Sequence, residues 1–197
     1  MVWNAPNVLT LLRIVLIPLI VVVYHLPMPM AHKIATLIFV LAAVTDWLDG
    51  YLARRLQQFS RFGAFLDPVA DKLMIAASLI LLVADGQVLA QVWDARLFAF
   101  VVLVILGREI AVSALREWMA ELGKRSHVAV SVVGKVKTTA QMLAIPFLLW
   151  QTPLMGLPIF RIGEVLLYVA AGLTLWSMAV YLQAAWPSLM QRGEPRA

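Results

Sequence analysis

Six apolar stretches, each about as long as a bilayer-spanning helix, constrain this chain more than any other feature. They cover residues 7–27, 33–55, 64–84, 96–117, 132–152 and 162–186. Of the 197 residues, 62% are hydrophobic and 14% are charged, whereas soluble domains have about 45–50% apolar and about 25% charged residues. We therefore predict an all-α integral membrane protein, with six transmembrane helices in a single domain over residues 1–197.

This composition excludes a water-soluble enzyme and a nucleic-acid-binding domain, although the net charge is +5. Basic loops in such an apolar chain are better explained by anionic lipid or by phosphate-bearing substrates. The absence of cysteine excludes disulfides, a thiolate nucleophile and cysteine-ligated metals. Arg13 lies inside the first stretch, and no basic segment precedes it, so we expect a first helix and not a cleavable signal peptide.

Basic residues near the helix ends predict the orientation, because cytoplasmic loops carry an excess of Lys and Arg. One side of the membrane would hold Arg54, Arg55, Arg61, Arg116, Lys124, Arg125, Lys135, Lys137, Arg192 and Arg196. The other side would hold only Lys33, Arg96 and Arg161. Both termini and the second and fourth loops are therefore expected in the cytoplasm.

Four aspartates fall on two helical faces at the second loop. In the second stretch the shared face holds Asp46, Asp49, Gly50, Ala53 and Arg54, and in the third it holds Gly63, Asp67 and Asp71. The loop between these helices is short, so we expect antiparallel neighbours with the two faces close together.

Four aspartates facing lipid would cost on the order of 12 kcal/mol, at up to roughly 3 kcal/mol each. They are therefore expected in a water-accessible pocket, where a cation would relieve their mutual repulsion. Carboxylates without His or Cys favour hard cations such as Mg²⁺, Ca²⁺ or Mn²⁺, and two such ions could assist displacement at phosphorus. A proton or cation path through the membrane is the alternative that the aspartates leave open.

The pattern Asp46-x2-Asp49-Gly50-x2-Ala53-Arg54-x8-Gly63-x3-Asp67-x3-Asp71 resembles, at every fixed position, the signature of the CDP-alcohol phosphatidyltransferases. The resemblance implies a six-helix membrane fold, usually a homodimer, that binds a CDP-linked lipid beside two divalent cations (Mg²⁺ or Mn²⁺). It implies that Asp46, Asp49, Asp67 and Asp71 ligate the metals and that Asp71 is the general base. The residues implied for binding the CDP moiety are Gly50, Ala53, Arg54 and Gly63.

Two further patterns bear on the second substrate. Asn7, Thr10 and Arg13 are spaced by three, and Asn7 could instead cap the first helix. Arg108 and Glu109 lie in the fourth apolar stretch, where they could form a structural ion pair. The remaining candidates for holding a second phosphate are Arg116, Lys135, Lys137, Thr138 and Gln141. Arg116 could alternatively be an ordinary positive-inside residue.

Taken in this order, the patterns resemble the bacterial phosphatidylglycerophosphate synthases over most of residues 1–142, and the resemblance fades over the last two helices. It implies CDP-diacylglycerol and sn-glycerol 3-phosphate as substrates in a bacterial inner membrane. We accordingly place Asn7 and Thr10 with the CDP-lipid, and the basic group that starts at Arg108 with the acceptor phosphate.

The alternatives are a sister transferase using phosphatidylglycerol, serine or inositol phosphate, or a transporter. A transporter usually places its ion site near the midplane and shows internal repeats. Neither feature is visible in this sequence.

Overall fold

Helices make up nearly all of the described structure. The computed structural model describes residues 5–56, 61–121 and 132–190, and within them no sheet strand occurs. Its helices are α1 (Ala5–Tyr24), α2 (Ala31–Leu56), α3 (Arg61–Ala84), α4 (Gly86–Gln91), α5 (Ala95–Glu121), α6 (Val132–Trp150) and α7 (Ile159–Met190). The six long helices coincide with the six apolar stretches, so the prediction of an all-α fold is confirmed.

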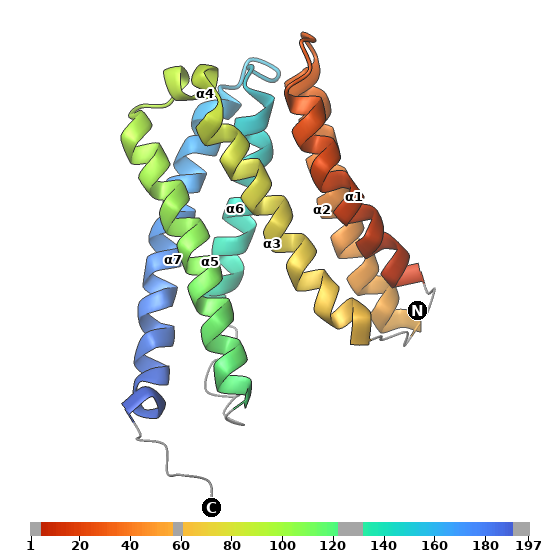
Figure 1. Ribbon diagram of the computed structural model, residues 1–197. Coiled ribbons are helices and arrows are strands. Elements are labelled where there is room, and N and C mark those ends of the chain that lie inside the picture. Colours follow the sequence, from red (N-terminus) through yellow and green to blue (C-terminus); the bar gives the residue numbers. More distant parts are fainter. Residues whose placement is uncertain (1–4, 57–60, 122–131, 191–197) are drawn as a thin grey trace, which may run out of the picture.

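α4 is a short helix that the sequence analysis read only as a break between two helices. It begins after Asp85, whose carboxylate accepts a hydrogen bond from the backbone N–H of Gln87 at 2.8 Å. That contact satisfies one of the free N–H groups of the first turn. α4 thus covers one end of the bundle between α3 and α5 (Figure 1).

The long helices pack around one another in the bundle. α1 packs against α2 and α3, and α7 packs against α5 and α6. Contacts of α2 with α6, and of α3 with α5, join these two sets of helices. α2 and α3 are antiparallel but touch each other little, because α1 lies against both. The two acidic faces lie close together, as expected, because Asp46 of α2 and Asp71 of α3 both contact Nη1 of Arg13 on α1.

The two ends of the bundle differ in what they hold. At the lower end of Figure 1, α1, α3 and α6 begin and α2, α5 and α7 end. The upper end holds α4 and the connections at residues 25–30 and 151–158. α1 begins and α7 ends at the same end of the bundle.

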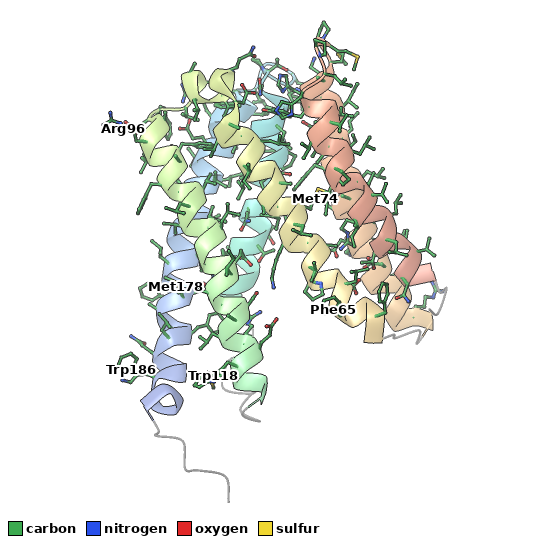
Figure 2. The ribbon with its side chains drawn as sticks, in the orientation of Figure 1. Phe65, Met74, Arg96, Trp118, Met178 and Trp186 are labelled. Carbon is green, nitrogen blue, oxygen red and sulfur yellow. The ribbon has the colours of Figure 1, made fainter. Side chains whose placement is uncertain are left out.

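Large apolar side chains cover the outside of the bundle. Val15, Leu37, Leu103 and Ile110 are each more than 60% exposed, whereas a soluble monomer rarely exposes large apolar patches. Tryptophan also occurs near both ends, with Trp186 near the lower end (Figure 2) and the exposed Trp93 beside α4. Tryptophan favours the two membrane–water interfaces, so this surface suits a bilayer.

The number of spans is not confirmed as six. In the described chain, four helices are long and apolar enough to cross a membrane: Asn7–Tyr24, Ala31–Leu52, Ala95–Met119 and Ile159–Gln183. α3 and α6 are also long helices, but they are not among the four that combine this length with a sufficiently apolar composition. Both carry charged side chains of the site, including Asp71 on α3 and Lys137 on α6.

Candidate functional site

Three of the motif's four aspartates converge on the guanidinium group of Arg13, which comes from α1. Arg13 Nη1 lies 2.8 Å from Asp46 Oδ1 and 2.7 Å from Asp71 Oδ1. Its Nη2 lies 2.5 Å from Asp49 Oδ2. Arg13 is thus the side chain that joins the acidic faces of α2 and α3.

The fourth aspartate is also bound by α1. Thr10, one turn before Arg13, donates its hydroxyl proton to Asp67 Oδ1 at 2.5 Å. Residues three apart lie on the same side of a helix, so one stripe of α1 reaches all four aspartates. We call Asp46, Asp49, Asp67 and Asp71 the acidic cluster.

Burial within the acidic cluster is uneven. The side chains of Arg13 and Asp49 are 1% and 5% exposed, whereas those of Asp46 and Asp71 are 33% and 37% exposed. Asp46 and Asp71 therefore form the accessible side of the cluster, and Arg13 with Asp49 forms its interior.

The residues expected to receive the CDP moiety fall at the same end of the bundle. Asn7 and Thr10 are buried on the Arg13 stripe, and α1 begins at Ala5, so the alternative that Asn7 caps this helix is wrong. Gly63 is buried and Gly50 is half-buried, beside the aspartates of their own helices. The side chains of Ala53 and Arg54 lie outside the described residues.

A cavity of about 290 Å³ lies between the acidic cluster and the basic residues of α5 and α6. Asp46 and Asp71 line one part of it. Its lining also includes five of the six residues expected to bind the acceptor: Arg108, Arg116, Lys137, Thr138 and Gln141. The side chain of the sixth, Lys135, lies outside the described residues. The structure therefore brings the two groups of motif residues to one cavity.

Two basic residues of this cavity, Arg108 and Lys137, are held by an acidic neighbour. Glu109 Oε1 lies 2.5 Å from Lys137 Nζ and 3.1 Å from Arg108 Nη1. The ion pair between Arg108 and Glu109, foreseen as an alternative, does form, and Lys137 shares it. Since one carboxylate faces two cations, the group keeps a net positive charge that suits an anionic ligand.

Two buried donors at the cavity lack a hydrogen-bond acceptor within the described part of the chain. They are Arg108 Nε and Gln141 Nε2, and both residues line the cavity. A buried donor without an acceptor is unfavourable by roughly 1–3 kcal/mol. A bound anion would supply acceptors here.

Several residues of the site were not assigned to it from the sequence, although Arg13 and Glu109 were noted there. Arg13 was detectable, because a charge within an apolar first helix needs a partner. Lys72 and Glu109 line the cavity and also adjoin motif residues. Tyr181 lines it from α7, a helix in which no motif directed attention to a site.

The acidic cluster has the oxygen donors that Mg²⁺ and Mn²⁺ prefer. However, within the residues described, no three Asp, Glu, His or Cys side chains are arranged so that they could hold one ion. Arg13 supplies the positive charge at the centre of the cluster. The donor set fits a divalent cation, provided that the carboxylates release some of their bonds to Arg13.

Comparison with known proteins supports the motif. The family model described as CDP-alcohol phosphatidyltransferase matches residues 3–176. The CDP-diacylglycerol–glycerol-3-phosphate 3-phosphatidyltransferase of Salmonella choleraesuis is 51% identical over 192 residues, which cover 98% of this chain and 100% of the relative. The proteins of that name from Shigella flexneri and Pectobacterium atrosepticum are also 51% identical, with 98% and 97% of this chain covered and 100% of each relative. The chain belongs to the CDP-alcohol phosphatidyltransferase family.

Proposed function

We propose that this chain transfers the phosphatidyl group of CDP-diacylglycerol to sn-glycerol 3-phosphate, giving phosphatidylglycerophosphate and CMP. The observation that carries the proposal is the single cavity in which Asp46 and Asp71 lie with Arg108, Arg116 and Lys137. The aspartates suit the reacting phosphate and its metal ions, while the cations suit a second, separate phosphate. The relatives that share about half of this sequence are named for the same reaction.

The acceptor is held first by its phosphate. Arginine and lysine form charge-assisted hydrogen bonds with phosphate oxygens. The buried Arg108 and Lys137 and the exposed Arg116 supply these donors at the cavity. Gln141 adds a buried amide N–H that lacks an acceptor in the described structure. Binding to these donors would direct the hydroxyl of the acceptor towards the acidic cluster.

The transfer step is a direct displacement at phosphorus. The acceptor hydroxyl oxygen forms a bond to the phosphorus that carries diacylglycerol, and the bond from that phosphorus to the oxygen of CMP breaks. Asp71 takes the hydroxyl proton, because it lines the cavity and is about a third exposed. Arg13 orients the Asp71 carboxylate through the 2.7 Å contact.

Two divalent cations, Mg²⁺ or Mn²⁺, would be held by Asp46, Asp49, Asp67 and Asp71 and would stabilise negative charge on the pyrophosphate. Arg54 is proposed to assist on the nucleotide side, with Asn7, Thr10, Gly50, Ala53 and Gly63 around the CDP-lipid. These assignments rest on the family signature and on the position of the described members beside the acidic cluster.

We also propose a bacterial cytoplasmic membrane location, with the lower end of the bundle and the site in the cytoplasm. Arg55 and Arg116 belong to this end, and basic residues concentrate on the cytoplasmic side. A homodimer, as the family resemblance implies, completes the proposal. Cross-linking of the purified protein in lipid nanodiscs would test this stoichiometry.

The experiment that tests the function uses purified protein with CDP-diacylglycerol and separate acceptors: sn-glycerol 3-phosphate, serine, inositol phosphate and phosphatidylglycerol. CMP release and the lipid product are measured with Mg²⁺, with Mn²⁺ and with excess chelator. We expect phosphatidylglycerophosphate only from glycerol 3-phosphate, and only with a divalent cation. A product from another acceptor alone would refute the acceptor assignment, and full turnover after exhaustive chelation would refute the metal assignment.

An Asp49→Asn substitution tests the acidic cluster, since it keeps the size of the side chain and removes its charge. We expect loss of turnover with either metal. The exposed Asp94, far from the cluster at the start of α5, is the matched control, and Asp94→Asn should leave turnover unchanged.

A further inference from the structure

Two arginines of the cavity are supported by one tyrosine of α7. Tyr181 is 5% exposed, and its hydroxyl oxygen accepts a hydrogen bond from Arg116 Nη2 at 2.8 Å. The ring centroid lies 5.1 Å from Arg116 Cζ and 5.8 Å from Arg108 Cζ. Both guanidinium groups are therefore within the range of a cation–π interaction with the same ring.

A serine one turn earlier on α7 holds the second arginine. Ser177 is buried, and its hydroxyl oxygen accepts from Arg108 Nη2 at 3.0 Å. The hydroxyl proton of Ser177 is donated to the backbone oxygen of Thr174 at 2.9 Å. Because this proton is already used, the lone pairs of Ser177 remain directed at Arg108.

These contacts address a physical problem in the cavity wall. Arg108 and Arg116 carry like charges, and their long side chains have many rotamers that do not face a ligand. A shared aromatic face offsets the repulsion, and the hydroxyl groups select one orientation of each guanidinium. A donor that is oriented before binding loses less conformational freedom when the phosphate arrives.

We infer that Tyr181 and Ser177 are positioning residues, which hold Arg108 and Arg116 in the orientation that binds the phosphate of the acceptor. This inference rests on the proposed function and deepens it. It gives α7 a part in selecting the second substrate, although α7 contributes no residue to the family signature quoted above.

A purely structural role for Tyr181 is the competing explanation. Its ring packs in a small apolar cluster with Val112 and Met119, beside Trp118 of α5 and Met178 of α7. Figure 2 shows these last two side chains on the lower halves of the two helices. A substitution that only loosened this packing would lower the amount of folded protein and would not distinguish the two substrates.

The variants are chosen to separate the two explanations. Tyr181→Phe keeps the ring and the packing and removes only the hydroxyl, while Tyr181→Leu also removes the ring. Ser177→Ala removes the acceptor of Arg108. The control is Tyr168→Phe on the same helix, whose lost hydroxyl donates to Glu164 at 2.9 Å in the upper half of α7, away from the cavity residues.

Steady-state kinetics of the purified full-length protein, with each substrate varied in turn, decide the matter. We expect the KM for glycerol 3-phosphate to rise about 3-fold in Tyr181→Phe and in Ser177→Ala, and about 10-fold or more in Tyr181→Leu, where 10-fold corresponds to about 1.4 kcal/mol. The KM for CDP-diacylglycerol should change less than 2-fold in all of them. Thermal stabilisation by glycerol 3-phosphate without CDP-diacylglycerol should weaken in the same order.

The outcomes distinguish failure of the inference from failure of the proposed function. If the unchanged protein uses glycerol 3-phosphate and folded Tyr181→Phe and Ser177→Ala keep its KM, or if both KM values rise equally, the positioning role is wrong. If the unchanged protein accepts only another alcohol, the proposed acceptor is wrong and the inference falls with it. If Tyr181→Leu does not fold, Tyr181→Phe and Ser177→Ala still decide.

Discussion

Replacing Arg13 with glutamine tests the centre of the acidic cluster most directly. The substitution removes the guanidinium group that contacts Asp46, Asp49 and Asp71 at 2.5–2.8 Å. Glutamine retains a polar side chain but brings no charge. The three carboxylates would then repel one another without compensation.

The magnitude follows from the burial of the partners. Breaking a buried ion pair by removing one member costs about 3–5 kcal/mol. The side chains of Asp46 and Asp71 are 33% and 37% exposed, so water screens part of this cost. We therefore expect about 3 kcal/mol, or a fall in Tm of roughly 6–12 °C at about 2–4 °C per kcal/mol for a chain of this size.

The assay is thermal unfolding of the purified protein in detergent, measured in excess chelator and in Mg²⁺. Without Arg13 the cation has no competitor for the carboxylates, so Mg²⁺ should raise the Tm of Arg13→Gln more than that of the unchanged protein. A ligand at about 100 times its Kd stabilises a folded protein by about 2.7 kcal/mol, which would restore most of the loss. Turnover should stay low, because the orientation of Asp71 is lost.

Arg55→Gln is the control. Arg55 is an exposed arginine on α2, and within the described residues its side chain contacts Tyr51, one turn earlier on the same helix. The variant should unfold at the same temperature as the unchanged protein. The reasoning would be refuted if Arg13→Gln were fully stable in chelator, or if Mg²⁺ stabilised it less than the unchanged protein.

Three further predictions concern other parts of the molecule. Lys137→Gln should raise the KM for glycerol 3-phosphate about 10- to 150-fold, since a charge-assisted hydrogen bond contributes roughly 1.5–3 kcal/mol; Lys33→Gln at the upper end is the control, and equal effects on both substrates would contradict the assignment. A cysteine at Met155, which is 96% exposed at the upper end, should react with an impermeant reagent in intact cells, and protection there would reverse the orientation. Burial raises the pKa of Asp85, but hydrogen bonds from Tyr24, from the backbone of Gln87 and from Gln151 outweigh it and leave the pKa below its ordinary value. Asp85 therefore stabilises the fold above the unfolded-state pKa of about 3.9 and loses this effect as the pH falls through the lower folded value. Accordingly, Asp85→Ala should lower stability by about 1 kcal/mol at pH 7, and a gap in Tm that did not narrow below pH 4 would refute this account.

Helical periodicity made much of the site predictable. On a helix, the spacing of Asp46 and Asp49, and of Asp67 and Asp71, determines a common face before any packing is known. The same holds for Lys137 and Gln141 on α6. A charged residue in an apolar helix must also find a polar environment, so the convergence of these faces at one end of the bundle followed from the positions of the helices along the chain.

The limits of prediction are equally local. α4 was missed because six residues are too few to show an apolar period. α3 and α6 carry charged residues of the site, and neither is among the helices that are long and apolar enough to cross a membrane. Six apolar stretches in the sequence therefore did not lead to six confirmed membrane-spanning helices.

The sequence by itself determined the helical class, the apolar exterior, the acidic cluster and most of the basic wall, because these depend on composition and on spacing within one helix. Only the tertiary structure decided which side chains from other helices complete the site. The residue spacing in α1 does not predict that Arg13 contacts the aspartates of α2 and α3. Likewise, the sequence of α7 does not predict that Tyr181 contacts two arginines of α5. The physical reason is that a contact between helices depends on their packing angle and on their rotation about their own axes, and both are set by the whole bundle and not by any one segment.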